Sequence, residues 1–230
     1  MLKKDKEITV VVSSRKNDEE SKAFIESIKQ TVGCKTNVIF VVNDNSMSLS
    51  RVYYSMLVND QIESDIIVFC HDDVEFLKKG WGEEVIRLFS KNKKYGIIGV
   101  AGSAEFDANA AWWNYQKKYG QVLHKHDGKS WLTAFSPLLD KDLEEVCVID
   151  GLFMAVKRSR ITKNFDPDLP GFDFYDIDFC LSNFIDGKTK IGVTTNIRLA
   201  HKSVGELSQN WYENRKIIND KYGKDYPIKI

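Results

Sequence analysis

An uninterrupted apolar run that ends in three polar side chains constrains the fold of this chain more than any other feature. Residues 66–70 show no polar alternation, and His71, Asp72 and Asp73 follow them directly. Such a run is typical of a strand buried on both faces, in the middle of a parallel sheet. Acidic residues at the carboxyl end of such a strand lie where α/β sheets bind ligands. Two carboxylates beside an imidazole suit a hard divalent cation, although aspartates there also cap helices or form turns.

Strands and helices alternate through the first hundred residues. We expect strands at 8–13, 38–42, 65–70 and 95–102, and helices at 18–31, 50–59 and 81–90. This alternation predicts an α/β fold with a mostly parallel central sheet and helices on both faces. Later apolar runs predict buried strands at 146–149 and 190–194, and helices at 179–184 and 206–222. The segment 103–142 has no clean periodicity, which indicates a lid or a binding loop.

Length and composition indicate a single domain without a nucleic-acid partner. The chain has 230 residues, of which 43% are hydrophobic, and its 33 basic residues balance its 33 acidic ones. Balanced charge gives no overall field that would attract nucleic acid or a membrane surface. Within the domain we expect a first half at 1–102, a second half at 103–205, and a C-terminal helix at 206–230. The sequence leaves the oligomeric state open.

Targeting signals and cysteine spacing point to a cytoplasmic protein. No apolar segment of signal-peptide type follows the charged N-terminus, and no run approaches the ~20 apolar residues that span a bilayer. The four cysteines, at positions 34, 70, 147 and 180, are scattered and form no C-x-x-C pair. We therefore expect reduced cysteines, mostly in the core, and neither a disulfide framework nor a zinc site.

Polar groups end the first three predicted strands, and together they suit a nucleotide. Ser13 and Arg15 follow the first strand, Asp44 and Asn45 the second, and the His-Asp-Asp triplet the third. In a parallel sheet these ends share one edge. Neither a G-x-G-x-x-G fingerprint nor a P-loop motif is present, so metal and basic side chains would have to hold the phosphates.

A second acidic cluster lies among aromatic residues at 172–179. Asp176 and Asp178 stand near the start of a short helical pattern, where negative charge also favours the helix dipole. Apolar surroundings raise the pKa of a carboxyl group and suit a general base. His201 follows the last apolar segment, and either a structural role or a role as a ligand near anions fits its position.

Six stretches of the chain, in this order, resemble those of one enzyme family: 68–74, 98–103, 112–120, 148–158, 174–180 and 192–201. The chain resembles family-2-type glycosyltransferases of the GT-A fold. More narrowly, it resembles the bacterial glycosyltransferase-like subfamily in which histidine begins the aspartate motif. Each stretch alone is a weak signal, but their combination and order are specific.

The resemblance implies that the half at 1–102 binds the nucleotide and that the half at 103–205 binds the acceptor and is catalytic. It also implies a role for each matching residue. Asp73, with His71 and His201, would bind Mn²⁺ or Mg²⁺, and Asp176 would be the catalytic base. The residues implied in nucleotide binding are Ser13, Arg15, Asp44, Asn45, Arg51 and Asp72. Those implied in binding the acceptor or sugar are Trp113, Asp150, Gly151 and Tyr175. Tyr175 departs from the family, because a glutamate usually precedes the catalytic aspartate.

The implied activity is sugar transfer, with inversion, from a nucleotide-diphosphate sugar to a hydroxyl of a glycan or another acceptor, and the resemblance favours a UDP-linked donor. A catalytically silent module that binds a nucleotide sugar or a partner protein stays open, because of the departure at Tyr175. A sugar nucleotidyltransferase is the other alternative, but the glycine-rich loop that this class needs after the first strand is missing.

Overall fold

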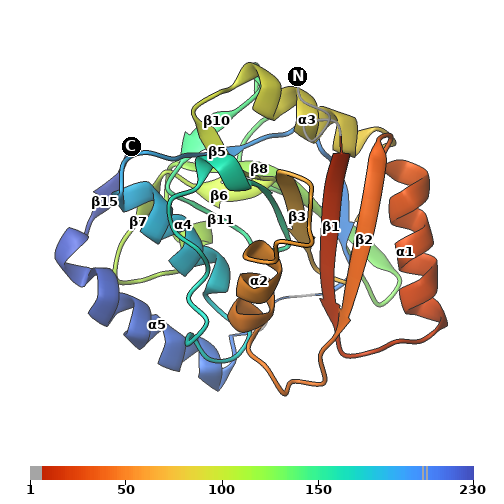
Figure 1. The fold of residues 1–230 in the computed structure, drawn as a ribbon. Helices are drawn as coiled ribbons and strands as arrows, with labels where there is room; N and C mark the ends of the chain where they lie inside the picture. Colours follow the sequence, from red (N-terminus) through yellow and green to blue (C-terminus); the bar gives the residue numbers. More distant parts are fainter. Residues whose placement is uncertain (1–6, 204, 206) are drawn as a thin grey trace.

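The computed structural model describes residues 7–203, 205 and 207–230. Its large sheet has seven strands in the order β10-β13-β5-β12-β3-β1-β2 (Figure 1). These strands are β1 (Glu7–Ser14), β2 (Lys35–Val42), β3 (Ile66–Cys70), β5 (Tyr95–Gly99), β10 (Glu144–Val146), β12 (Phe153–Lys157) and β13 (Lys190–Val193). Parallel pairs join β1 to β2 and β3, and β5 to β13, whereas β12 and β10 pair antiparallel. The predicted α/β fold with a mostly parallel central sheet is confirmed.

Helices cover both faces of this sheet. They are α1 (Glu19–Thr31), α2 (Leu49–Leu57), α3 (Trp81–Lys91), α4 (Tyr175–Ile185) and α5 (Gln209–Tyr222), with short 3-10 turns at Trp112–Asn114, Arg158–Arg160 and Gly223–Asp225. Figure 1 shows α2 on one side of β1 and β2, and α1 on the other. Asp18 caps α1 by accepting a hydrogen bond from the amide of Ser21, as its position before the apolar pattern predicts. None of the helices described is long and apolar enough to cross a membrane.

A second sheet stands at the carboxyl edge of the first and brings distant residues together. It has the order β11-β6-β8-β14-β4, with β9 paired to β8. Its strands are β4 (Val74–Phe76), β6 (Ala101–Ser103), β8 (Lys118–His126), β9 (Lys129–Ala134), β11 (Val148–Ile149) and β14 (Leu199–His201). The antiparallel register sets His201 opposite Val74, next to Asp73, and the parallel register sets His124 beside His201. A short pair joins β7 (Glu105–Phe106) to β15 (Ile228–Lys229).

The segment 103–142 is more regular than its sequence suggested, and its expected role as a lid or a binding loop stays a prediction. It contains a regular hairpin in which β8 pairs with β9 over six residue pairs. Asp127 and Gly128 form the turn, and both have positive φ, at 49° and 72°. Asp-Gly is a strong signal for a two-residue hairpin turn, because both residues tolerate this backbone region. The irregularity was expected because the two strands mix charged, polar, aromatic and aliphatic residues without a clean alternation.

Three predicted strands differ from expectation in burial or length. β2 is the edge strand, so its side chains are partly exposed and not buried as predicted. The run 95–102 divides into β5 and β6, and the run 146–149 divides into β10 and β11, because the chain passes from one sheet to the other. β12 was not predicted, although all five of its residues are buried.

Two helices also differ from expectation. α4 is longer than the predicted 179–184, and α5 begins at Gln209 with Ser208 as its N-cap. Glu206, the predicted start of the last helix, lies outside the described residues. The proposed division at 102 and 205 stays a prediction. The strand β12 of the second half lies between β3 and β5 of the first, so the two halves share one sheet.

Candidate active site

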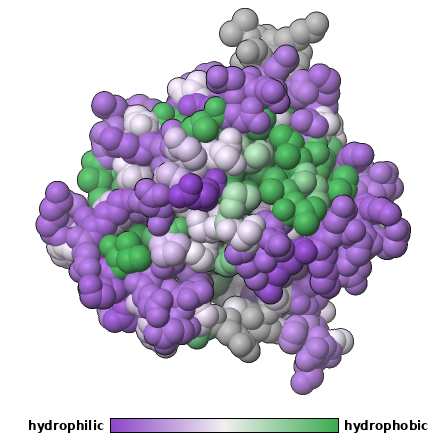
Figure 2. Space-filling model, turned by 60° about the horizontal axis from the view of Figure 1, so that its bottom comes forward, coloured by the Kyte–Doolittle hydropathy of each residue, from purple (hydrophilic) through white to green (hydrophobic). Residues whose placement is uncertain are grey.

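The carboxyl ends of β1 and β3 enclose a cavity of about 210 Å³, which we call the nucleotide cavity. Its lining includes five residues singled out from the sequence: Ser13, Arg15, His71, Asp72 and Asp73. The strands meet here because the parallel register aligns Val12 with Cys70, so the polar residues that follow both strands share one edge. In Figure 2 this edge of the sheet faces the viewer, and hydrophilic residues surround most of the face that is shown.

Three residues expected to bind nucleotide do not line this cavity. Asp44 is exposed, and its carboxylate accepts a hydrogen bond from the amide of Ser46 at 3.2 Å. Asn45 is exposed as well, and the guanidinium of Arg51 pairs with Asp168 at 2.9 Å. Their roles therefore stay predictions without support from their position.

Asn43 lines the nucleotide cavity in their place, and it is buried. Its side chain accepts a hydrogen bond from the amide of Met47 and donates one to the carbonyl oxygen of the same residue. The signal was present in the sequence, since Asn43 is the first polar residue after the apolar run of β2. The prediction chose Asp44 instead, which is the acid two positions after the end of that run.

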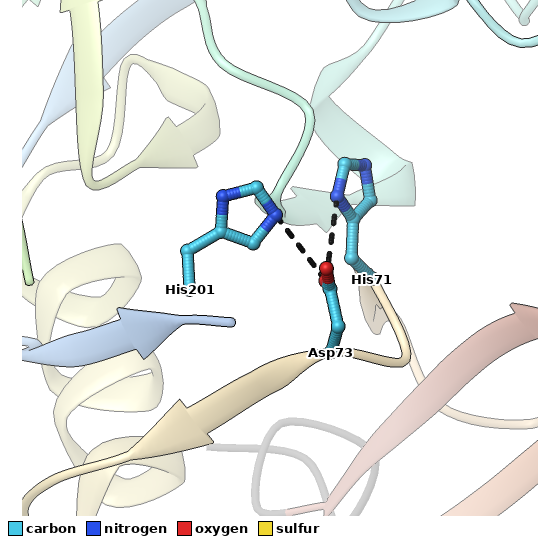
Figure 3. Close-up of side chains that lie close together, drawn as sticks. All are labelled: His71, Asp73 and His201. Atoms are coloured by element: carbon cyan, nitrogen blue, oxygen red, sulfur yellow. Dashed lines mark ion pairs between the residues drawn. The ribbon is translucent and has the colours of Figure 1, made fainter. Parts of the chain in front are cut away.

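His71, Asp73 and His201 form one cluster, in which both imidazole rings are directed toward the carboxylate (Figure 3). Oδ1 of Asp73 lies 3.2 Å from Nε2 of His201 and 4.0 Å from Nδ1 of His71. The same oxygen is buried, and no donor among the described residues reaches it in hydrogen-bond geometry. A buried carboxylate oxygen without a donor, faced by two imidazoles, is suited to a cation, and all three residue types ligate divalent metals.

The electrostatics of the cluster keep the carboxylate ionised. Burial by itself raises the pKa of Asp73, but the His201 imidazole and then that of His71 lower it below its usual range. Burial lowers the pKa of His71, against the opposing effect of Asp73. Burial also lowers the pKa of His201, but the adjacent Asp73 carboxylate outweighs it, so the net direction is upward.

Tyr175 contacts the cluster through His71. Its hydroxyl lies 2.8 Å from Nε2 of His71, and its ring is buried. Gly151 allows this arrangement, because a Cβ atom there would overlap the tyrosine hydroxyl. The phenol keeps its proton, since burial raises its pKa well above the ordinary value. Tyrosine in place of the family's glutamate thus puts a neutral hydroxyl beside a candidate metal ligand.

A larger cavity of about 520 Å³ adjoins the nucleotide cavity and shares His71 and Phe172 with it; we call it the acceptor cavity. Its lining includes the remaining sequence candidates: Trp113, Asp150, Gly151, Tyr175, Asp176 and His201. The exposed apolar surface of its wall exceeds the polar surface, and much of it is aromatic. Trp131 does not line this cavity; its ring stacks on that of His124, with the centroids 5.2 Å apart.

Sequence reasoning missed several residues of the acceptor cavity, among them His124, Phe174 and Trp211. His124 stands beside His201 only because β8 and β14 pair, and Trp211 reaches the cavity from α5. Nothing local in the sequence marks these pairings. The His124–Trp131 contact had one usable signal, the Asp-Gly turn that sets the hairpin register.

Asp176 has the properties of a general base. It stands in the first turn of α4, and its two carboxylate oxygens accept hydrogen bonds from the amides of Gly151 at 2.7 Å and Ile177 at 2.8 Å. Burial, followed by repulsion from the Asp150 carboxylate, raises the pKa of Asp176 to about 7. A base with a pKa near the working pH accepts a proton most effectively, so this carboxylate is poised for proton transfer.

The fold is that of GT-A glycosyltransferases, as comparison with solved structures shows. GalNAc-T7, determined with UDP, GalNAc and Mn²⁺, is 10% identical, with a TM-score of 0.60 over 93% of this chain and 47% of that one. The mannosyltransferase PcManGT of Pyrobaculum calidifontis, determined with GDP-Man and Mn²⁺, is 8% identical, with a TM-score of 0.54 over 95% and 63%. The catalytic domain of Drosophila β1,4-galactosyltransferase 7 is 12% identical, with a TM-score of 0.52 over 91% and 79%.

The chain belongs to the glycosyltransferase-like family, whose model matches residues 8–222. This membership and the GT-A fold support a nucleotide-sugar glycosyltransferase. A curated relative from Fuscovulum blasticum, described as ATP synthase subunits region ORF 6, is 26% identical over 170 residues, which are 71% of this chain. The match spans 62% of that relative's length.

Proposed function

We propose that this protein transfers a sugar from a UDP-linked donor to an acceptor hydroxyl with inversion, and that Mn²⁺ or Mg²⁺ assists. The observation that carries the proposal is the adjacency of two cavities around His71. One is lined by the ends of β1 and β3, and the other contains the half-buried carboxylate of Asp176, with a pKa of about 7. The metal-ligand cluster stands at their junction.

Two groups of residues would hold different parts of the donor. Ser13, Arg15 and Asn43 line the nucleotide cavity, where they hydrogen-bond the base and ribose. Asp73, His71 and His201 would hold the divalent ion, which supplies Lewis-acid stabilisation to the leaving diphosphate.

The transfer step depends on Asp176. Its carboxylate removes the proton from the acceptor hydroxyl while the hydroxyl oxygen bonds to the anomeric carbon of the donor sugar. The bond from that carbon to the diphosphate breaks on the opposite face, and its electron pair leaves with the diphosphate. The product is therefore inverted, and Asp176 ends protonated. Aromatic walls around the acceptor cavity exclude water, which limits hydrolysis of the donor.

Tyr175 is proposed to position His71 for the metal. If Nε2–H of His71 donates its hydrogen bond to the Tyr175 hydroxyl oxygen, Nδ1 keeps its lone pair and faces Asp73. Partners of this kind orient metal-bound histidines, and their loss typically lowers metal affinity about 10–100-fold. We expect Tyr175→Phe to weaken Mn²⁺ binding by about that factor, measured by calorimetry.

Tyr222→Phe is the matched control for this measurement. It also removes one tyrosine hydroxyl from the interior, one that donates to Asp178 at 2.8 Å and lies outside both cavities. It should lower the free energy of unfolding while leaving Mn²⁺ affinity unchanged. Equal Mn²⁺ affinity in wild type and Tyr175→Phe would contradict the positioning role.

A donor screen tests the function itself. Nucleotide sugars are incubated with Mn²⁺, and nucleotide release is measured with and without candidate acceptors. We expect release to depend on both a UDP-sugar and an acceptor. Release without any transfer product would indicate hydrolysis only, and nucleotide binding with no turnover would favour the silent binding module.

The nucleotide preference is a separate prediction. In the presence of Mn²⁺ we expect UDP to bind more tightly than ADP, because the family resemblance favours a UDP-linked donor. Calorimetric titration of both nucleotides measures the difference. Equal or tighter binding of ADP would argue against a UDP-linked donor.

A further inference from the structure

A third cavity, of about 470 Å³, adjoins the acceptor cavity on the side away from the nucleotide; we call it the outer cavity. The two share Trp211 and Leu207 as walls, so they lie next to each other beside the start of α5. The nucleotide cavity shares no lining residue with the outer cavity. The transfer step described above uses none of the groups in the outer cavity.

Aromatic rings run from the acceptor cavity into the outer cavity. The ring centroids of Trp113 and Trp211 are 6.3 Å apart, and those of Trp211 and Tyr212 are 5.2 Å apart. Trp113 lines the acceptor cavity and Tyr212 the outer cavity, where it is 51% exposed. The face of an aromatic ring is electronegative, so it attracts the weakly positive C–H groups on the flat side of a pyranose.

Polar groups stand around these rings at the outer cavity. Asp107 accepts a hydrogen bond from the Tyr115 hydroxyl at 2.8 Å through Oδ1, and the exposed amide of Asn114 lines the same wall. The guanidinium of Arg215 lies 5.8 Å from the Trp211 ring centroid, and no carboxylate of the described residues forms an ion pair with it. Carboxylate, amide and guanidinium groups are the usual partners of sugar hydroxyls.

This combination favours a sugar over other occupants. An acyl chain would leave the Arg215 guanidinium desolvated without a partner, which costs free energy. A single-stranded nucleic acid would need a basic groove, and the lining here includes one acid, Asp107, and one base, Arg215. A pyranose has a flat apolar face and a rim of hydroxyl groups. The aromatic rings and the polar groups of the outer cavity match these two surfaces.

We propose that the acceptor is an oligosaccharide of at least two units, and that the outer cavity binds its second unit. The terminal unit would lie in the acceptor cavity, against Trp113, with its reacting hydroxyl at Asp176. The next unit would lie across Trp211, against Tyr212 and Arg215. This inference rests on the proposed glycosyltransferase function and names the substrate class of the same site.

A saccharide array tests the inference by binding alone. The probes are immobilised saccharides of one to four units, and the full chain is applied with UDP and Mn²⁺. We expect the best ligand with two or more units to bind about tenfold more tightly than its own terminal monosaccharide. Tyr212→Ala and Arg215→Ala should each remove most of this gain and leave the binding of UDP unchanged.

Ile217→Ala is the matched control. Ile217 is on the same helix and 39% exposed, and it lines neither the acceptor cavity nor the outer cavity. It should bind every saccharide as the wild type does.

The outcomes separate this inference from the function on which it rests. Binding that does not increase from one unit to two overturns the inference, and so does an unchanged gain in both α5 variants. Binding of UDP with Mn²⁺ but of no saccharide on the array also overturns it, while leaving the nucleotide site intact. Failure of UDP to bind would count against the proposed function itself.

Discussion

Asp73→Ala is expected to abolish Mn²⁺-dependent binding of UDP while leaving the fold intact. Oδ1 of Asp73 is the buried oxygen that both imidazoles face, and no donor among the described residues is directed at it. Removing it takes the only carboxylate from the cluster, so two neutral imidazoles would remain to hold a doubly charged ion. Calorimetric titration of UDP with and without Mn²⁺ measures the loss, and circular dichroism checks the fold.

The backbone gives a reason to expect the fold to survive. The carbonyl oxygen of Asp73 accepts a hydrogen bond from the amide of Lys202 at 2.9 Å, and the substitution does not change this bond. Glu75→Ala is the matched control. Its carboxylate is two residues away and pairs with Lys125 at 2.8 Å, outside both cavities. It should retain binding, whereas equal binding by Asp73→Ala would show that the cation is held elsewhere.

Local signals explain why the part of the fold around β1 and β3 was predictable. β1 and β3 are continuous apolar runs, and all five residues of β3 are buried, as the lack of polar alternation indicates. The polar residues that end these strands meet because parallel strands begin and end together. The position of Asp73 at a sheet edge therefore followed from sequence alone.

The remaining parts of the fold depend on pairings between distant segments. β12 is apolar like β3, but nothing in its own residues indicates that it inserts antiparallel between β3 and β5. The second sheet consists mostly of strands of two or three residues, too short for a periodic signal. Hence the sequence placed Asp176 and His201 in separate segments, and only the pairing of β4 with β14 explains why His201 reaches Asp73.

The same limit of prediction applies to the individual residues that were expected to bind the nucleotide. Ser13, near the end of β1, and Asp73, shortly after β3, line the nucleotide cavity as their positions in the sequence predicted. Asp44 and Arg51 lie in a loop and on a helix, where one residue of shift turns a side chain away from the site. The structure pairs both with neighbours on the surface instead.

Asp176→Asn is expected to lower sugar transfer by about 10²–10⁴-fold while donor affinity barely changes. The amide keeps the size of the side chain but accepts no proton from the acceptor hydroxyl. Donor affinity is retained because Asp176 lines the acceptor cavity and not the nucleotide cavity. Single-turnover transfer and UDP titration measure the two quantities separately.

The pH profile identifies the base independently of the size of the rate loss. Burial and the Asp150 carboxylate raise the pKa of Asp176 to about 7, so the ionised form gains population as the pH rises through 7. We expect kcat/KM of the wild type to increase across this range and then level off. The residual activity of Asp176→Asn should lack this rising limb of the pH profile.

The same carboxyl group should make the free energy of unfolding decrease as the pH rises, which is opposite to the trend in kcat/KM. A carboxyl group with a raised pKa binds more protons in the folded state than in the unfolded state between about pH 4 and 7. Its contribution to the free energy of unfolding is complete below the unfolded pKa and is lost as the pH rises through about 7. Denaturant unfolding at a series of pH values should show this decline in the wild type, and a smaller decline in Asp176→Asn.

Two further aspartates make the assignment to Asp176 testable against its neighbours. Asp178 is on the same helix, but its carboxylate accepts hydrogen bonds from Lys221 at 2.7 Å and Tyr222 at 2.8 Å, which tie α4 to α5. Asp178→Asn should therefore lower stability and keep the kinetic limb near pH 7. Asp150 lines the acceptor cavity and is the rival base. Near-normal turnover in Asp176→Asn, together with loss of the limb in Asp150→Asn, would transfer the role to Asp150, whereas loss of donor binding in Asp176→Asn would indicate a structural role.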